Sequence, residues 1–185
     1  MSRTPIELKD PARAALLAWL VPGLGHFYQG RTRKGWLYLT CILGLYLIGF
    51  GLGEGKIVFW SWVNPMNDPE HFRLSFLGQL GVGLPAIPAL IQGTLRYLGR
   101  DPILGGFMAE PTAEVLNALH PKLGKLLEVG WLYTMMAGLL NILAIFDAHA
   151  GPALPEGDAP AAALAAAPAT AALPKVAGRA AEAGA

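Results

Sequence analysis

The sequence predicts an all-α membrane protein with about four transmembrane helices, short interfacial helices and a disordered C-terminal tail. Two observations support this fold class. The chain is 54% hydrophobic and only 15% charged, with a mean hydropathy of +0.42, whereas ordinary soluble domains carry roughly 25% charged residues. The charged residues that remain gather between long apolar runs, and a helix needs roughly 20 apolar residues to cross a bilayer.

The composition also excludes several function classes. A net charge of +1 gives the chain no overall field that would attract nucleic acid, so no nucleic-acid partner is expected. The single cysteine, Cys41, lies within an apolar run, which excludes an internal disulfide and a cysteine-based zinc cluster. The first apolar run does not end in a small-residue cleavage site, so we expect it to be retained in a multi-pass protein of the cell membrane.

A polar N-terminus, residues 1–11, is followed by a predicted transmembrane hairpin, residues 12–52. The first arm, 12–28, is short for a span, and Pro22 and Gly23 weaken its end, so a kinked or shallow helix is expected. The second arm, 35–52, is uncharged and is the clearest span. Gly49 and Gly53 in this arm have a spacing that permits close helix approach, although such glycines also mark fraying helix ends.

The turn of the hairpin carries the most informative motif of the chain. Its glycines allow the chain to turn, its aromatic rings favour the headgroup level, and its basic side chains are expected to meet anionic headgroups, at about 1 kcal/mol each. The motif residues are Pro22, Gly23, Gly25, His26, Phe27, Tyr28, Gly30, Arg31, Arg33, Lys34, Gly35 and Trp36. The motif is interpreted as an anchored turn or as a binding site for a lipid or a protein partner.

The connection 53–73 is predicted to be interfacial. It contains the aromatic and β-branched run 57–63, which is too short to span. Tryptophan favours the membrane interface, so a segment that lies on the bilayer explains Trp60 and Trp62. A short strand is the competing interpretation of this run.

The third apolar segment, 74–95, is a predicted proline-broken transmembrane helix. Pro85 and Pro88 stand three residues apart and are expected to bend or interrupt it. Irregular backbone at membrane depth is tolerated only where protein or a water-filled cavity covers it. We therefore expect this segment, which also carries Gln79 and Gln92, to face other helices.

Residues 96–128 form a predicted amphipathic surface segment with one or two short helices, the first starting near residues 111–114. The fourth span is predicted at 129–147. Small and polar residues share one of its faces and bulky apolar residues lie opposite, as expected for a helix packed on its neighbours. The small face comprises Thr134, Ala137, Gly138, Asn141, Ala144 and Ala148, with Ile145 as its exception. Residues 148–185 form an Ala/Pro-rich tail that is predicted to be disordered.

The sequence shows no catalytic, cofactor-binding or metal-binding pattern. Asp147 and His149 stand two apart, which points them to different sides of a helix rather than at one metal ion; Asp147 is instead expected to be the hydrated end of the fourth span. The best candidates for function are the intramembrane polar and packing residues: Gln79, Pro85, Pro88, Gln92, Thr134, Gly138 and Asn141. They are expected to bond helix to helix, at about 0.6 kcal/mol each, or to line a pathway.

The turn motif, from Pro22 to Gly30 with the basic cluster 31–34 and Gly35, resembles the two-transmembrane-helix domain family. The whole chain resembles an uncharacterised bacterial multi-pass membrane-protein family, a domain of unknown function that begins with this hairpin and adds two spans. Asn141 and the ending from Asp147 to Gly151 fit that resemblance, which implies the bacterial inner membrane. Neither resemblance implies an activity, catalytic residues or a cofactor.

The sequence therefore predicts a non-enzymatic membrane interaction or scaffold protein. Its expected partners are the lipid bilayer and either another membrane protein or a second copy of the chain, bound through the small-residue helix faces. The alternative is a small transporter or channel component lined by the helix that carries Pro85 and Pro88.

Overall fold

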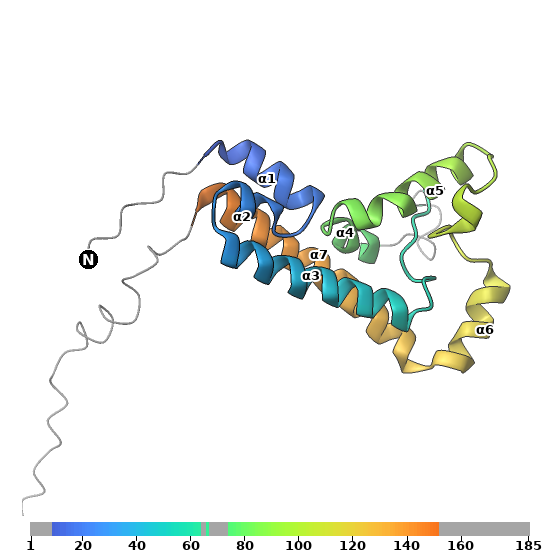
Figure 1. Ribbon diagram of the computed structural model, residues 1–185. Helices are drawn as coiled ribbons and strands as arrows, with labels where there is room; N and C mark the ends of the chain where they lie inside the picture. The colour runs from blue at the N-terminus through green and yellow to red at the C-terminus, as the bar shows by residue number, and fades with distance from the viewer. Residues whose placement is uncertain (1–8, 64–65, 67–73, 152–185) are drawn as a thin grey trace, which may run out of the picture. The chain divides into compact units, whose positions relative to one another are not determined.

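The computed structural model describes residues 9–63, 66 and 74–151, all within one compact unit (Figure 1). These residues form helices and connections without a strand. The helices are α1 (Pro11–Leu20), α2 (Leu24–Tyr28), α3 (Thr32–Leu52), α4 (Leu74–Leu80), the 3-10 helix η1 (Leu84–Ala86), α5 (Ile87–Tyr97), the 3-10 helix η2 (Leu104–Gly106), α6 (Ala113–Leu123) and α7 (Lys125–Ala150). The predicted disordered tail beyond residue 151 and most of the polar N-terminus lie outside the described residues.

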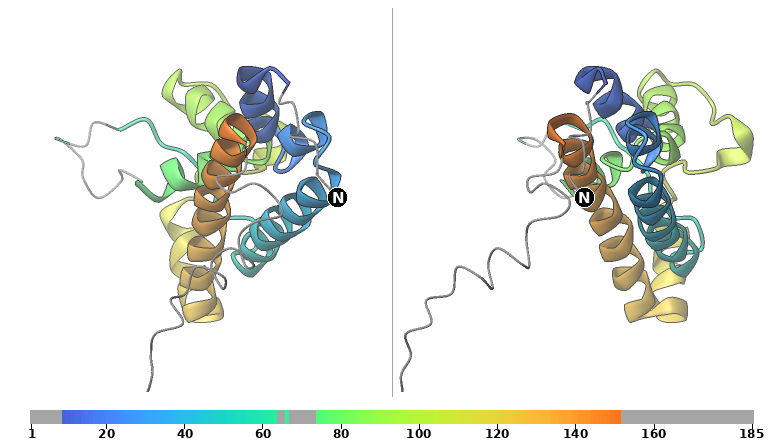
Figure 2. Two further views of the ribbon diagram at one scale, coloured as in Figure 1. Left: turned by 90° about the vertical axis from the view of Figure 1, so that its left-hand side faces the viewer. Right: turned by 60° about the vertical axis from the view of Figure 1, so that its left-hand side comes forward.

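Helix α7 is the centre of the fold. It packs against α1, α3 and α4, and Figure 2 shows α3 lying beside it. Helices α3 and α7 approach closely at Gly49 and Gly130, where a side-chain Cβ on either residue would lie 2.8 Å from the carbonyl oxygen of the other. Gly49 therefore serves helix approach, as its spacing predicted, whereas Gly53 ends α3 and packs against Ile57.

The two faces of α7 have an unusual distribution of side chains. Apart from Leu127 near its start, the buried face is small or polar: Gly130, Thr134, Ala137, Gly138, Asn141, Ala144 and Ala148 are all buried. The exposed face is bulky and apolar, and includes Leu132, Met136, Leu139, Leu140, Leu143 and Phe146. The predicted division of this helix into two faces is confirmed. Ile145, the exception, is partly buried beside Ala14, Ala18 and Ala148.

Among the residues that the structure describes, two helices are long and apolar enough to cross a membrane. They are α3 and α7, each with a mean hydropathy of 1.7 over its most apolar window. Helix α7 begins earlier and ends later than the predicted span 129–147. The first predicted segment, 12–28, is divided into α1 and α2, and each piece is far shorter than the roughly 20 residues of a span.

The third predicted segment is broken, as expected from its prolines, but the break lies before them. The chain leaves the helix at residues 81–83 and begins again with η1 and α5. Gly83 has φ +83° and lies so close to the carbonyl of Trp19 that no side chain would fit. Pro85 and Pro88 occupy the first turns of η1 and α5, where the missing N–H of proline costs nothing.

The connection 54–63 differs from the interfacial segment that the sequence predicted. Residues 57–60 are buried, with exposed fractions of 7% or less, and within 57–63 only Trp62 is exposed. The carbonyl of Ile57 accepts hydrogen bonds from Trp131 Nε1 (3.0 Å) and Gln79 Nε2 (3.5 Å). The prediction was wrong for 57–60 because these donors satisfy irregular backbone that could not otherwise be buried. The competing prediction of a strand is also wrong, because the segment has no strand structure.

Residues 98–124 include η2 and the surface helix α6. Helix α6 begins where the sequence predicted, because the Thr112 hydroxyl accepts a hydrogen bond from the Val115 N–H (3.4 Å) and caps its first turn. Most of its residues are exposed.

Candidate functional site

The predicted turn motif forms a tightly packed junction of α1, α2 and α3. Gly23 adopts φ +84°, and a side chain there would strike the carbonyl of Gly35. Gly25 lies directly against the carbonyl of Ala14, and the Phe27 ring covers Gly35. These glycines are therefore needed for close packing as well as for turning. Phe27 and Trp36 meet edge to face at 5.4 Å, which fixes the aromatic side of the turn.

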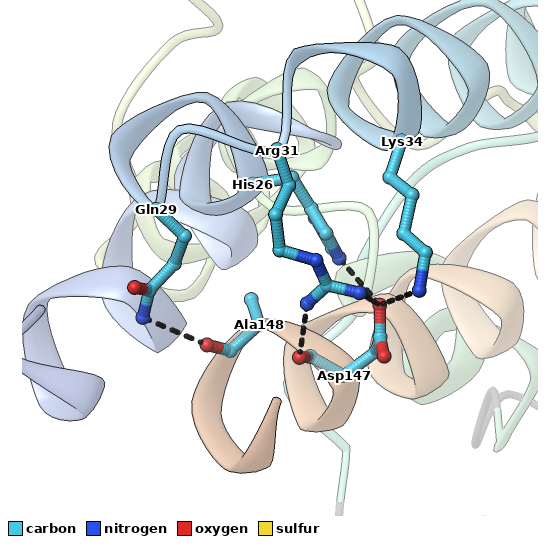
Figure 3. Close-up of polar contacts among 6 residues, drawn as sticks. All are labelled: His26, Gln29, Arg31, Lys34, Asp147 and Ala148. Atoms are coloured by element: carbon cyan, nitrogen blue, oxygen red, sulfur yellow. Dashed lines mark hydrogen bonds and ion pairs between the residues drawn. The ribbon is translucent and has the colours of Figure 1, made fainter. Parts of the chain in front are cut away.

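Three side chains of this motif converge on Asp147, near the end of α7 (Figure 3). Asp147 Oδ2 lies 2.8 Å from Arg31 Nη2, 2.9 Å from His26 Nε2 and 3.7 Å from Lys34 Nζ. Arg31 also donates from Nη1 to the Asp147 carbonyl (3.0 Å). We call this group of four residues the latch, because it joins the two ends of the described chain.

Gln29 extends the latch to the last turn of α7. Its Nε2 donates to the Ala148 carbonyl (3.2 Å), and its Oε1 accepts from the Lys9 N–H (2.9 Å). The last carbonyls of a helix have no partner within the helix, and positive charge is favoured beside them. The motif therefore supplies both the hydrogen bonds and the positive charge that the end of α7 requires.

Burial makes the electrostatics of the latch strong. The side chains of His26 and Arg31 are 0% and 3% exposed, against 21% for Asp147. Burial lowers the pKa of His26, and the charges of Arg31 and Lys34 act in the same direction, while the hydrogen bond to Asp147 opposes them. The balance favours a neutral imidazole, which donates its Nε2 hydrogen to the Asp147 carboxylate. The Tyr38 ring covers His26 at 4.5 Å.

Two predictions about these charges need correction. Asp147 is not a hydrated helix end, because three basic or imidazole side chains surround it. Arg31 does not face the headgroups, because its side chain is turned inward; Arg33, by contrast, is exposed. The signal that could have indicated their pairing is an acidic residue directly after one apolar span and a basic cluster directly before another.

The predicted intramembrane polar residues bond one element to another. Gln79 Nε2 donates to Thr134 Oγ1 (2.8 Å), and Asn141 Nδ2 donates to the carbonyls of Ala18 (3.1 Å) and Gly81 (2.9 Å). The carbonyl of Pro85 accepts from the Tyr46 hydroxyl (3.1 Å).

Gln92 and Gly138 also have neighbours within the fold. Gln92 Nε2 donates to the carbonyls of Ile103 (2.6 Å) and Phe107 (3.0 Å) in the loop that follows α5. Gly138 lies against the Gly78 carbonyl, with no room for a side chain. Within the described chain these residues therefore contribute to internal packing, and they are not gathered at the latch.

Comparison with known proteins places the chain in one family. A family model described as a family of unknown function (DUF6677) matches residues 13–159, which include the latch and every described helix from α3 onward. The chain belongs to this family. Neither the curated proteins nor the solved structures include a significant match.

Proposed function

We propose that this DUF6677 protein is an integral, multi-pass protein of the bacterial inner membrane that acts as a non-enzymatic interaction or scaffold protein. One observation carries the proposal: α7 buries its small and polar face and exposes its large apolar one. In water this arrangement would leave a large apolar surface exposed. In lipid it is expected, because small residues let helices approach and bulky side chains can face the hydrocarbon.

The proposed arrangement has four membrane segments. Helices α3 and α7 cross the bilayer, since 21 and 26 residues extend for about 32 and 39 Å at 1.5 Å per residue. The segments α1–α2 and α4–α5 enter only partway, because each is interrupted. Their breaks are covered by protein, as irregular backbone at membrane depth requires.

The surface that would bind a partner is the outer face of α7, and not the small-residue face that the sequence indicated. Gly138 packs against α4, and the Asn141 side-chain amide donates to carbonyls of α1 and of the turn that follows α4. Large side chains such as Leu139 and Leu143 remain exposed, at 48% and 64%. In the bilayer these side chains are open to lipid, a second copy or another membrane protein.

Oxidative crosslinking in native membranes tests this proposal. In a Cys41→Ser background, Leu143→Cys on the outer face should form a crosslinked dimer or a crosslinked hetero-complex, and Ala137→Cys on the buried face is the matched control. Retention in the membrane pellet after alkaline carbonate extraction tests membrane integration separately. Release into the supernatant would contradict integration, and a lack of crosslinks along the whole outer face would contradict the interaction role.

The alternative is a small transporter or channel component lined by the segment that carries Pro85 and Pro88. The interruption of this segment favours it, since broken helices occur beside polar pathways. The hydrogen bonds of Gln79 and Gln92 to neighbouring elements support the packing role instead. Labelling of Gln79→Cys and Gln92→Cys by a charged thiol reagent in intact membranes would favour transport, and protection would favour the scaffold.

A further inference from the structure

An open cavity of about 370 Å³ lies apart from the latch, between residues 61–63, helix α5 and the residue Glu110. Its size falls in the range of small-molecule sites. Ser61, Arg96 and Glu110 provide its polar groups, and Trp62 and Tyr97 its aromatic ones. Gly93 in its wall lies against the Trp60 carbonyl, which brings α5 close to the segment 57–63.

The two charged side chains of the cavity differ in depth: the Glu110 carboxylate is mostly buried, and the Arg96 guanidinium is mostly exposed. The Glu110 side chain is 14% exposed and the Arg96 side chain is 61% exposed. Glu110 Oε2 accepts a hydrogen bond from the Ser61 hydroxyl and lies 3.4 Å from Arg96 Nε. The terminal amino groups of Arg96 make no hydrogen bond or ion pair with the residues that the structure describes. They can therefore bind an anion while Nε keeps its contact with Glu110.

The loop that carries Glu110 is held in a fixed conformation. Leu104 and Met108 have φ values of +53° and +55°, in the left-handed region that non-glycine residues rarely adopt and that persists only where the surroundings enforce it. The Gln92 side chain holds the loop in this conformation. Its Nε2 donates to the carbonyls of Ile103 and Phe107, and its Oε1 accepts from the Ile103 N–H (3.2 Å). Glu110 therefore has a fixed position in the absence of a ligand.

We infer that this cavity binds a phosphoethanolamine group, a zwitterion of ammonium and phosphate. The ammonium would pair with the Glu110 carboxylate beside the rings of Trp62 and Tyr97, since cations are attracted to aromatic faces. The phosphate would pair with the terminal amino groups of Arg96, whose planar fork matches phosphate oxygens. The choice of phosphate as the anion rests on the proposed membrane location, where such headgroups are abundant.

Phosphoethanolamine has two sources, the headgroup of a phospholipid and the free compound. The positions of Trp62 and Tyr97, 49% and 71% exposed, favour the lipid, because these amphipathic rings prefer the headgroup level. The source is distinguished by titrating the full-length protein in detergent with soluble O-phosphoethanolamine, and by mass spectrometry of the lipid retained after purification from membranes that contain phosphatidylethanolamine and phosphatidylglycerol.

Calorimetric titration with O-phosphoethanolamine tests the site. Arg96→Gln and Glu110→Gln should each weaken binding roughly tenfold or more, which is the loss expected for one charged contact. Arg100→Gln and Glu114→Gln are matched controls, since both residues are exposed and neither lines the cavity. Circular dichroism melting of each variant shows whether it remains folded. Trp62→Ala provides a second test, of the aromatic side of the cavity, and Thr94→Val is its control because it removes the Trp62–Thr94 hydrogen bond and keeps the ring.

The outcomes separate the site from the membrane proposal. If the protein binds O-phosphoethanolamine, and this binding is lost in the cavity variants but kept in the controls, the site is supported. This conclusion does not depend on whether carbonate extraction shows that the protein is integrated in the membrane. Selective retention of phosphatidylethanolamine over phosphatidylglycerol, lost in the same variants, assigns it to lipid. Equal losses in the control variants, or folded wild-type protein that binds neither the compound nor the lipid selectively, would overturn the inference.

Discussion

At the residue scale, Asp147 decides whether the buried cations of the latch are balanced. Asp147→Asn leaves Arg31 buried without a negative partner, and loss of one partner from a buried pair costs about 3–5 kcal/mol. We expect about 3 kcal/mol, the low end, because the Asp147 side chain is 21% exposed. Chemical unfolding of the detergent-solubilised protein measures this, with Asp101→Asn, in an exposed loop, as the control. An equal loss in both variants would contradict the latch.

A double-mutant cycle separates the latch from a general effect of charge. Arg31→Gln removes the cation that lies closest to Asp147, so the Arg31→Gln/Asp147→Asn protein should lose less stability than the sum of the single losses. Arg33 is adjacent in sequence but exposed, and Arg33→Gln combined with Asp147→Asn should be additive. Additivity in both cycles would show that the 2.8 Å contact between Arg31 and Asp147 makes no contribution to the free energy of unfolding.

His26 gives the latch a pH dependence with a definite sign. Its pKa is lowered in the folded protein, first by burial and then by the charge of Arg31, whereas the unfolded value is about 6.5. The unfolded chain therefore binds the proton more readily, and stability is complete above about pH 6.5 and falls as the pH drops below it. Thermal melting between pH 7.5 and 5.5 should show this decline. The decline should be reduced in His26→Gln and unchanged in His120→Gln, an exposed histidine; an unchanged decline in His26→Gln would assign the effect elsewhere.

At the element scale, the approach of α4 to α7 depends on Gly138. A Cβ at this position would overlap the Gly78 carbonyl, so Gly138→Ala must separate the two helices, at a cost of about 1–3 kcal/mol. Gly44 lies within α3 with open space around it, and Gly44→Ala should be neutral or stabilising by up to about 1 kcal/mol. Melting of the two variants in the same detergent compares them, and equal behaviour would contradict close packing at Gly138.

Much of each helix could be predicted from its own sequence. The faces of α7 followed from the spacing of Thr134, Gly138 and Asn141, and the start of α6 from Thr112. The break before Pro85 could be predicted as well, but not its position, because Gly83 was fixed by contact with Trp19 on another element. Local pattern determined the elements, and distant contacts determined where they end.

The candidate site could be predicted only in part for the same reason. The motif indicated a packed turn, but its partner Asp147 lies 121 residues after His26, and no local spacing connects them. The burial of 57–60 also escaped prediction, since it depends on donors from Gln79 and Trp131. Sequence alone predicts an interfacial position for an aromatic run, because it does not show which donors will bond to the backbone carbonyls of that run.

At the scale of the whole molecule, the native Cys41 reports whether α3 is surrounded by lipid. Its side chain is exposed in the middle of a proposed span. In membrane fragments open on both sides, an uncharged maleimide should modify it slowly, because a thiol in hydrocarbon stays protonated, and a charged maleimide should not modify it. Asn117→Cys on α6, in a Cys41→Ser background, should react with both reagents because Asn117 is exposed outside the proposed spans. Equal rates of both reagents at Cys41 would place that surface in water.

The latch also has a consequence for the order in which the protein is made. Because His26 and Asp147 are 121 residues apart, translation at roughly 5–20 residues per second adds Asp147 about 6–24 s after His26. During that interval Arg31 and Lys34 lack the carboxylate that later neutralises them. A chain that ends before Asp147 lacks the carboxylate that balances this positive turn, so closing of the latch distinguishes chains that contain Asp147 from chains that stop before it.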